Sequence, residues 1–130
     1  KVWAEKHGLK SDERYFQKEL DMFVKLFPTG KLLEIGSGYG ADATQFIARG
    51  YDYIGIDISK SLIKIAKTMT NSDKFFEMTI YDLKFKRDQF QGFWSASTLI
   101  HIHKSRIKQA LTNIHTVVRN GGIGFVSVMV

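Results

Sequence analysis

The sequence predicts an α/β protein in which helices cover both faces of a doubly wound, mainly parallel sheet. Short apolar runs bounded by glycine alternate with longer stretches whose apolar residues recur at helical spacing. Strands and helices that alternate in this way form βαβ crossovers, which place the strands parallel to one another. The length of 130 residues suits one domain, and we expect residues 1–130 to form it.

The first part of the chain predicts a helix, a strand and a second helix. Residues 11–27 carry an amphipathic stripe, and Ser11 can cap this N-terminal helix. The apolar run at 32–35 is too short for a helix and predicts a strand. A helix follows over 41–49, with Gly50 in the C-terminal cap position.

The middle of the chain repeats the same pattern. Residues 53–56 predict a second strand, and Ser59 is a suitable N-cap for the next helix. Residues 75–78 predict a third strand whose alternation is imperfect. The mixed, charged stretch 81–90 is expected to be a loop or a short helix.

The last part of the chain predicts a strand, a long helix and a final strand. The expected strand covers 93–96, and a clear helical stripe covers 104–118. Gly121-Gly122 should break this helix before a strand over 123–130. That last run has no charge and no proline, so it would leave an unprotected edge. We expect either a homodimer joined through this strand or a chain truncated from a longer protein.

Composition narrows the class of protein. The chain has no cysteine, which excludes disulfides and thiolate chemistry and makes a cytoplasmic protein the default. No apolar run approaches the roughly 20 residues of a membrane span, and no membrane partner is expected. The net charge of +6 is spread along the chain, which favours a solvated surface over a nucleic-acid site. No metal site is expected.

The residues after the predicted strands carry the candidate chemistry, because ligands of such sheets bind beyond the carboxyl ends of the strands. Glu34 to Gly40 reads E-I-G-S-G-Y-G, a loop whose glycines let the backbone turn sharply near a ligand. Asp57 follows the second strand at the offset typical of a carboxylate that binds ribose hydroxyls. Asp82 and Leu83 follow the third strand, and could meet one edge and one face of an adenine ring.

A nicotinamide- or flavin-binding domain is the first alternative, because Gly36, Gly38 and Ala41 satisfy the dinucleotide fingerprint. Three carboxylates at one sheet edge nevertheless favour a nucleoside that carries positive charge over one that carries phosphates. Glu34 in particular would crowd a pyrophosphate.

At this point the sequence resembles the class I S-adenosylmethionine-dependent methyltransferases, in their small-molecule branch. Residues 34–40 resemble motif I of that family, and residues 53–59 (Y-I-G-I-D-I-S) resemble motif II. Residues 92–102 with 118–122 (V-R-N-G-G) resemble its fourth strand, the following helix and the turn before the fifth strand. Asn120 stands where the family has proline, and the usual sixth and seventh strands are missing. The strand order is expected to be 3-2-1-4-5, in a Rossmann-like fold.

The resemblance implies S-adenosyl-L-methionine as the cofactor and assigns roles to residues. Gly36, Ser37 and Gly38 would cradle the methionine part, and Glu34 would reach its ammonium group. Asp57 would hold the ribose. Ile58 would flank the adenine, Asp82 would accept a hydrogen bond from the adenine amino group, and Leu83 would pack on the ring. The backbone near Ala96 would accept a hydrogen bond from the ammonium group.

The residues name no catalytic base. His101 is a weak candidate for a catalytic role, and His103 is a weaker one. The expected function is methyl transfer to a small molecule. A non-catalytic S-adenosylmethionine-binding module and an RNA or protein methyltransferase stay open as alternatives. The missing strands favour the former, and the charge of +6 gives the latter faint support.

Overall fold

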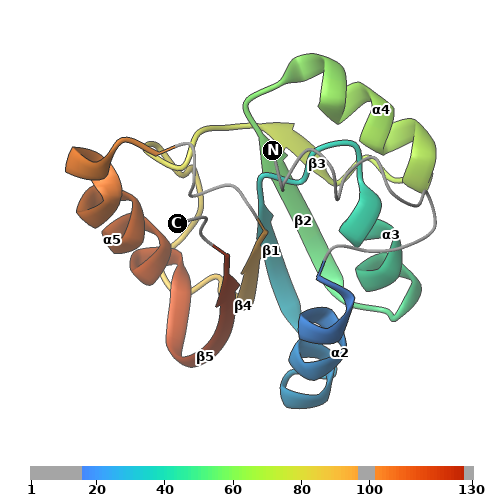
Figure 1. Ribbon diagram of the computed structural model, residues 1–130, viewed down its shortest axis with the longest axis horizontal. Coiled ribbons are helices and arrows are strands. Elements are labelled where there is room, and N and C mark those ends of the chain that lie inside the picture. Colours follow the sequence, from blue (N-terminus) through green and yellow to red (C-terminus); the bar gives the residue numbers. More distant parts are fainter. Residues whose placement is uncertain (1–15, 97–101, 128–130) are drawn as a thin grey trace.

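The computed structural model describes residues 16–96 and 102–127 and contains one five-stranded sheet (Figure 1). All the strand pairs are parallel. Their order is β3-β2-β1-β4-β5, so the expected 3-2-1-4-5 order is confirmed. The strands are β1 (Lys31–Ile35), β2 (Asp52–Asp57), β3 (Phe75–Glu77), β4 (Phe90–Ser95) and β5 (Val118–Val126).

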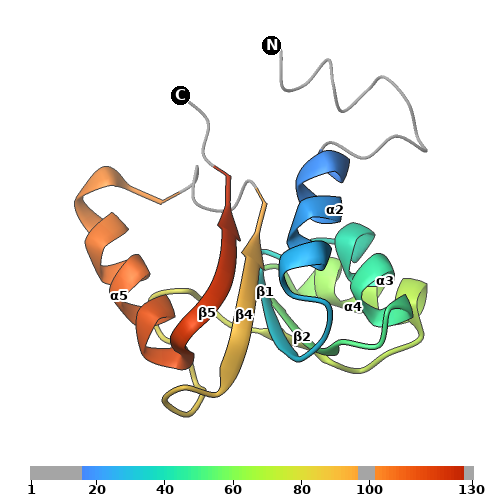
Figure 2. The same ribbon diagram turned by 90° about the horizontal axis from the view of Figure 1, so that it is seen from below.

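Helices cover both faces of the sheet, as the sequence predicts. Figure 2 shows α2, α3 and α4 on one side of the sheet and α5 on the other. The helices are α2 (Gln17–Leu26), α3 (Ala41–Ala48), α4 (Lys60–Thr70) and α5 (Ile107–Val117), and a 3₁₀ turn, η2 (Lys104–Arg106), leads into α5. None of the helices in the described part of the chain has the length and hydropathy needed to cross a membrane.

Two apolar cores lie on the two faces of the sheet. The first is rich in aromatic rings, with Phe46 and Trp94 fully buried at its centre, and it packs α2, α3 and α4 against the strands. The second packs α5 and the segment 78–85 against the opposite face. β1 is buried on both faces after Lys31, which explains why its apolar residues do not alternate with exposed polar ones.

The first half of the chain follows the predictions closely. Ser59 caps α4 as expected, because its Oγ accepts a hydrogen bond from the amide of Leu62 at 3.2 Å. The third strand is shorter than predicted and ends at Glu77. The expected cap at Ser11 lies outside the described residues.

The second half departs from the predictions at strand ends. β4 begins at Phe90 rather than at 93, so the loop expected over 81–90 ends one residue earlier. β5 begins at Val118, directly after α5, rather than at 123. Phe90 of β4 pairs with Val118 of β5, and Gly92 pairs with Ile123. β5 therefore has more residues than β4 between these two pairs, and Gly121 and Gly122 lie in the resulting bulge. Because α5 ends at Val117, Gly121 and Gly122 do not break the helix as expected; they lie inside the strand.

Candidate functional site

The glycine-rich loop after β1 is fixed to the end of β2 by backbone hydrogen bonds. The amides of Gly36 and Ser37 both donate to the carbonyl oxygen of Ile56, at 2.8 and 2.9 Å. The amide of Gly38 donates to Oδ2 of Asp57 at 2.9 Å. The two motifs that the sequence singled out are therefore brought together at the carboxyl edge of the sheet.

Asp57 joins the glycine loop to the start of α4. Its Oδ1 accepts from the amide of Ser59 at 2.9 Å, while its Oδ2 accepts from Gly38. Each carboxylate oxygen has a second lone pair, so these bonds leave acceptor capacity for ribose hydroxyls. The carboxylate is half-exposed, and a ligand at this edge can reach it.

Glu34 is buried at the end of β1, where it has a specific partner. Its side chain is only 3% exposed, and its Oε1 accepts a hydrogen bond from the hydroxyl of Tyr53 on β2. Burial, followed by the charge of Glu34 and this hydrogen bond, raises the pKa of Tyr53 well above its ordinary value. The tyrosine therefore stays a hydrogen-bond donor to the carboxylate at neutral pH.

The loop has open space for a ligand, and it also contains a buried polar atom that lacks a hydrogen-bond partner among the described residues. Gly38 has a φ of +57°, and a Cβ atom added there would meet nothing within 4 Å. The Oγ of Ser37 is buried without a hydrogen-bond partner among the described residues. Since unsatisfied buried hydroxyls are uncommon, this one indicates a place for a ligand or water. The open cradle, the hydroxyl and the nearby carboxylates fit the polar, cationic end of S-adenosylmethionine.

A cavity of about 320 Å³ lies beside the end of β3 and brings together two of the three residues assigned to adenine. Ile58, which is 74% exposed, and Asp82 both line it. Leu83 does not line it and packs half-buried against the second core. Asp82 also pairs with Lys84 at 2.8 Å. The sequence did not indicate the other lining residues, Glu77, Met78, Thr79 and Lys84.

The remaining candidates follow β4 in the sequence. Ala96 is half-buried and packs against the first core. His101 lies outside the described residues. His103 is described, and its Nδ1 accepts from the amide of Ser105 at 3.2 Å, so it caps the turn before α5.

The sequence missed two polar residues of this edge. Tyr53 was assigned only to a strand, and its partnership with Glu34 depends on the strand register. Ser95, at the end of β4, is fully buried, and its Oγ has no hydrogen-bond partner in the described part of the chain. A serine or tyrosine in an otherwise apolar strand is the signal that could have identified both.

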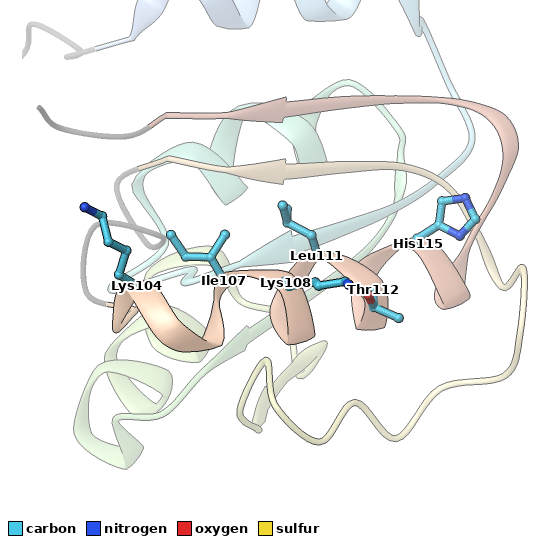
Figure 3. A pocket seen from close by; sticks show the side chains of 6 residues that line it. All are labelled: Lys104, Ile107, Lys108, Leu111, Thr112 and His115. Carbon is cyan, nitrogen blue, oxygen red and sulfur yellow. The ribbon is translucent and has the colours of Figure 1, made fainter.

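A second, shallower cavity of about 680 Å³ contains none of the predicted site residues. Figure 3 shows that its lining residues come from η2 and α5 alone. They are Lys104, Ile107, Lys108, Leu111, Thr112 and His115. The carboxyl edge of the sheet therefore stays the candidate ligand site.

A family model described as the methyltransferase domain matches residues 32–122, well over half of the chain. The match spans the glycine loop, Asp57 and the bulge with Gly121 and Gly122. The chain belongs to the methyltransferase domain family. Its motifs resemble those of the class I S-adenosylmethionine-dependent methyltransferases, and this resemblance is thus confirmed.

Individual proteins are similar to this chain in sequence or in fold. An uncharacterized protein of Methanocaldococcus jannaschii is 30% identical over 122 residues, covering 92% of this chain and 56% of that protein. The crystal structure of a Pyrococcus horikoshii protein has a TM-score of 0.74 at 18% identity, covering 85% of this chain and 57% of that chain. An S-adenosylmethionine-dependent methyltransferase of Mesorhizobium loti has a TM-score of 0.67 at 17% identity, covering 80% and 50%. This chain spans little more than half the length of these relatives.

Proposed function

We propose that the chain binds S-adenosylmethionine at the carboxyl edge of its sheet and serves methyl transfer to a small-molecule nucleophile. One observation carries the proposal: the open glycine loop at Gly38 is held by Asp57 directly beside the buried acid Glu34. Family membership supports the same cofactor.

Each part of the cofactor has residues that suit its chemistry. The ammonium group is assigned to Glu34 and the backbone near Ala96, and the methionine part to the loop from Gly36 to Gly38. The ribose is assigned to Asp57. The adenine is assigned to the cavity lined by Ile58 and Asp82. Leu83 is a weaker member of this set, because its side chain packs into the second core instead.

The electrostatics of this edge favour a cationic ligand over a dinucleotide. Glu34 and Asp57 place two carboxylates beside the loop, and a pyrophosphate there would be repelled by them. The third predicted carboxylate, Asp82, lies in the cavity at the end of β3, where it pairs with Lys84. The sulfonium and ammonium groups of S-adenosylmethionine would instead be attracted.

When bound, S-adenosylmethionine supplies a methyl group that its sulfonium already activates. The chain's residues then have to bind the cofactor and the acceptor, align the acceptor atom with the methyl carbon, and exclude water from the site. Neutral or soft nucleophiles need no general base for such an in-line displacement. His101 stays the candidate where a base is needed.

Calorimetry on the purified chain tests the proposal. S-adenosylmethionine and S-adenosylhomocysteine should bind, and NAD should bind much more weakly because of the carboxylates. A preference for NAD would overturn the proposed cofactor. If the folded chain binds none of these three ligands, the proposed site itself is overturned.

The small-molecule acceptor is supported by the sequence of residues 118–122, which resembles that branch of the family. Turnover assays with small nucleophiles, RNA and protein separate the alternatives. An RNA substrate should bind with strong salt dependence. Cofactor binding without turnover on any class of acceptor would favour a non-catalytic binding module.

A further inference from the structure

The buried pair of Glu34 and Tyr53 lies directly under the proposed cofactor loop. Both side chains are 3% exposed, and the tyrosine hydroxyl donates to the carboxylate. Burying a charged carboxylate is costly unless it is hydrogen-bonded. The buried carboxylate therefore needs a hydrogen-bond donor in the free protein, and it can attract a cationic group of the ligand in the complex.

Strand register explains how the tyrosine reaches the acid. Glu34 on β1 lies beside Gly55 on β2, while Tyr53 lies beside Leu32. Alternate residues of a strand point to the same face, so Tyr53 and Gly55 share the face that Glu34 uses. The tyrosine ring therefore extends along β2, over Gly55, to the carboxyl end of the sheet.

Gly55 is required for this arrangement. A Cβ atom there would lie 2.5 Å from the Tyr53 hydroxyl oxygen, and 3.0 Å from both Cδ1 of Phe75 and Cβ of Ser37. The hydroxyl thus lies between the strand, the acid and the base of the glycine loop.

Aromatic neighbours fix the ring itself. Phe46 stacks on Tyr53 at 6.4 Å between ring centroids, and Phe75 packs against it at 5.6 Å. With the ring held on two sides, the direction of its hydroxyl is set by the core rather than by solvent.

We propose that Tyr53 is a positioning residue that holds the Glu34 carboxylate toward the ammonium group of the bound cofactor. It acts through Glu34 and makes no contact with the cofactor itself. The inference rests on the proposed function, since it assigns Glu34 to that ammonium group. Its consequence is selective: Tyr53 strengthens binding only of ligands that carry the amino-acid moiety.

Two probes measure this selectivity by calorimetry. S-adenosylhomocysteine carries the ammonium group, whereas 5′-methylthioadenosine has the same nucleoside without it. Tyr53→Phe should weaken the binding of S-adenosylhomocysteine by about tenfold, which is the scale of one hydrogen bond to a charged group. It should weaken the binding of 5′-methylthioadenosine by less than about twofold. Glu34→Gln should show the same selectivity. In the Glu34→Gln background, Tyr53→Phe should have no further effect on the ratio of the two affinities.

Tyr51→Phe is the matched control. Tyr51 is also buried, its hydroxyl donates to the carbonyl oxygen of Phe27, and its ring contacts Phe46 at 5.5 Å. It lies before β2, at the opposite end of the sheet. Its variant should bind both probes as the unchanged chain does.

The outcomes separate the two claims. If the unchanged chain binds neither probe, the proposed function fails. If it binds both and Tyr53→Phe weakens both equally, or neither, then Tyr53 is only a core residue and the inference is overturned. Thermal unfolding of each variant confirms that the compared proteins are folded.

Discussion

The carboxylate of Asp57 accepts a hydrogen bond from the amide of Gly38 at 2.9 Å, across the gap between two strand ends. The same side chain accepts from Ser59 at 2.9 Å, at the start of α4. One side chain therefore sets the shape of the glycine loop and of the following turn. It also presents acceptor atoms where a ribose is proposed to bind.

Asp57→Ala should affect binding and stability together. The loss of a hydrogen bond to a charged group should weaken S-adenosylmethionine binding by roughly 1.5–3 kcal/mol. Two backbone amides also lose their acceptor, so the free energy of unfolding should fall by about 1–3 kcal/mol. Calorimetry and urea unfolding measure the two effects.

Asp52→Ala is the control for this variant, because Asp52 is exposed at the other end of the same strand. It should change neither quantity by more than about 0.5 kcal/mol. An unchanged affinity in Asp57→Ala would show that the ribose binds elsewhere.

Gly38→Val should abolish cofactor binding while the protein still folds. The added side chain would fill the open space above the loop, and the φ of +57° is strained for a branched residue. Gly50→Val provides the same kind of strain at a φ of +86°, also with nothing within 4 Å of the added Cβ, but at the end of α3.

Both variants should lose a similar free energy of unfolding, and only Gly38→Val should lose the ligand. Calorimetry on the two folded proteins makes the comparison. Full-affinity binding by Gly38→Val would contradict the assignment of this loop.

The alkaline pH dependence of stability follows from the buried tyrosines. Burial and Glu34 raise the pKa of Tyr53 well above 10, and burial raises that of Tyr51 against the opposing charge of Arg49. Below about pH 10 both the folded and unfolded chains keep these protons, and the contribution is constant. Above it the unfolded chain loses them first, so the free energy of unfolding should fall.

The slope for each tyrosine should approach about 1.4 kcal/mol per pH unit, measured by urea unfolding between about pH 9 and 11. Tyr53→Phe should reduce the fall, and the exposed Tyr39→Phe serves as the control. An identical alkaline slope in Tyr53→Phe would show that this hydroxyl ionises as easily in the folded chain.

The sequence predicted those features of the fold and site that depend on local patterns. The spacing in sequence between the glycine loop and Asp57 predicted that the two lie close together, because adjacent parallel strands end at the same edge of the sheet. The Tyr53–Glu34 pair could not be predicted, since it depends on which residue of β2 lies beside β1. The start of β5 at Val118 was missed for the same reason: the bulge exists only relative to β4.

The outer edge of β5 should pair with a second copy of the chain. In the described residues β5 pairs with β4 alone, and its stretch Ile123–Val126 has neither charge nor proline. The opposite edge strand, β3, is short and carries Glu77, whose carboxylate lies 4.0 Å from Nζ of Lys60. Short length and a charged side chain are features that keep an edge strand unpaired. In β5 the comparable features, Arg119 and the bulge, lie before residue 123, so residues 123–126 are left without them.

Light scattering and hydrogen exchange over a range of concentrations test this pairing. The apparent mass should rise toward that of a dimer, and outward amides of β5 should become more protected at the same concentrations. The amides of β3 provide an internal control and should not change. A monomer at every concentration contradicts the pairing. If its β5 amides are nonetheless protected, the edge is covered within the monomer.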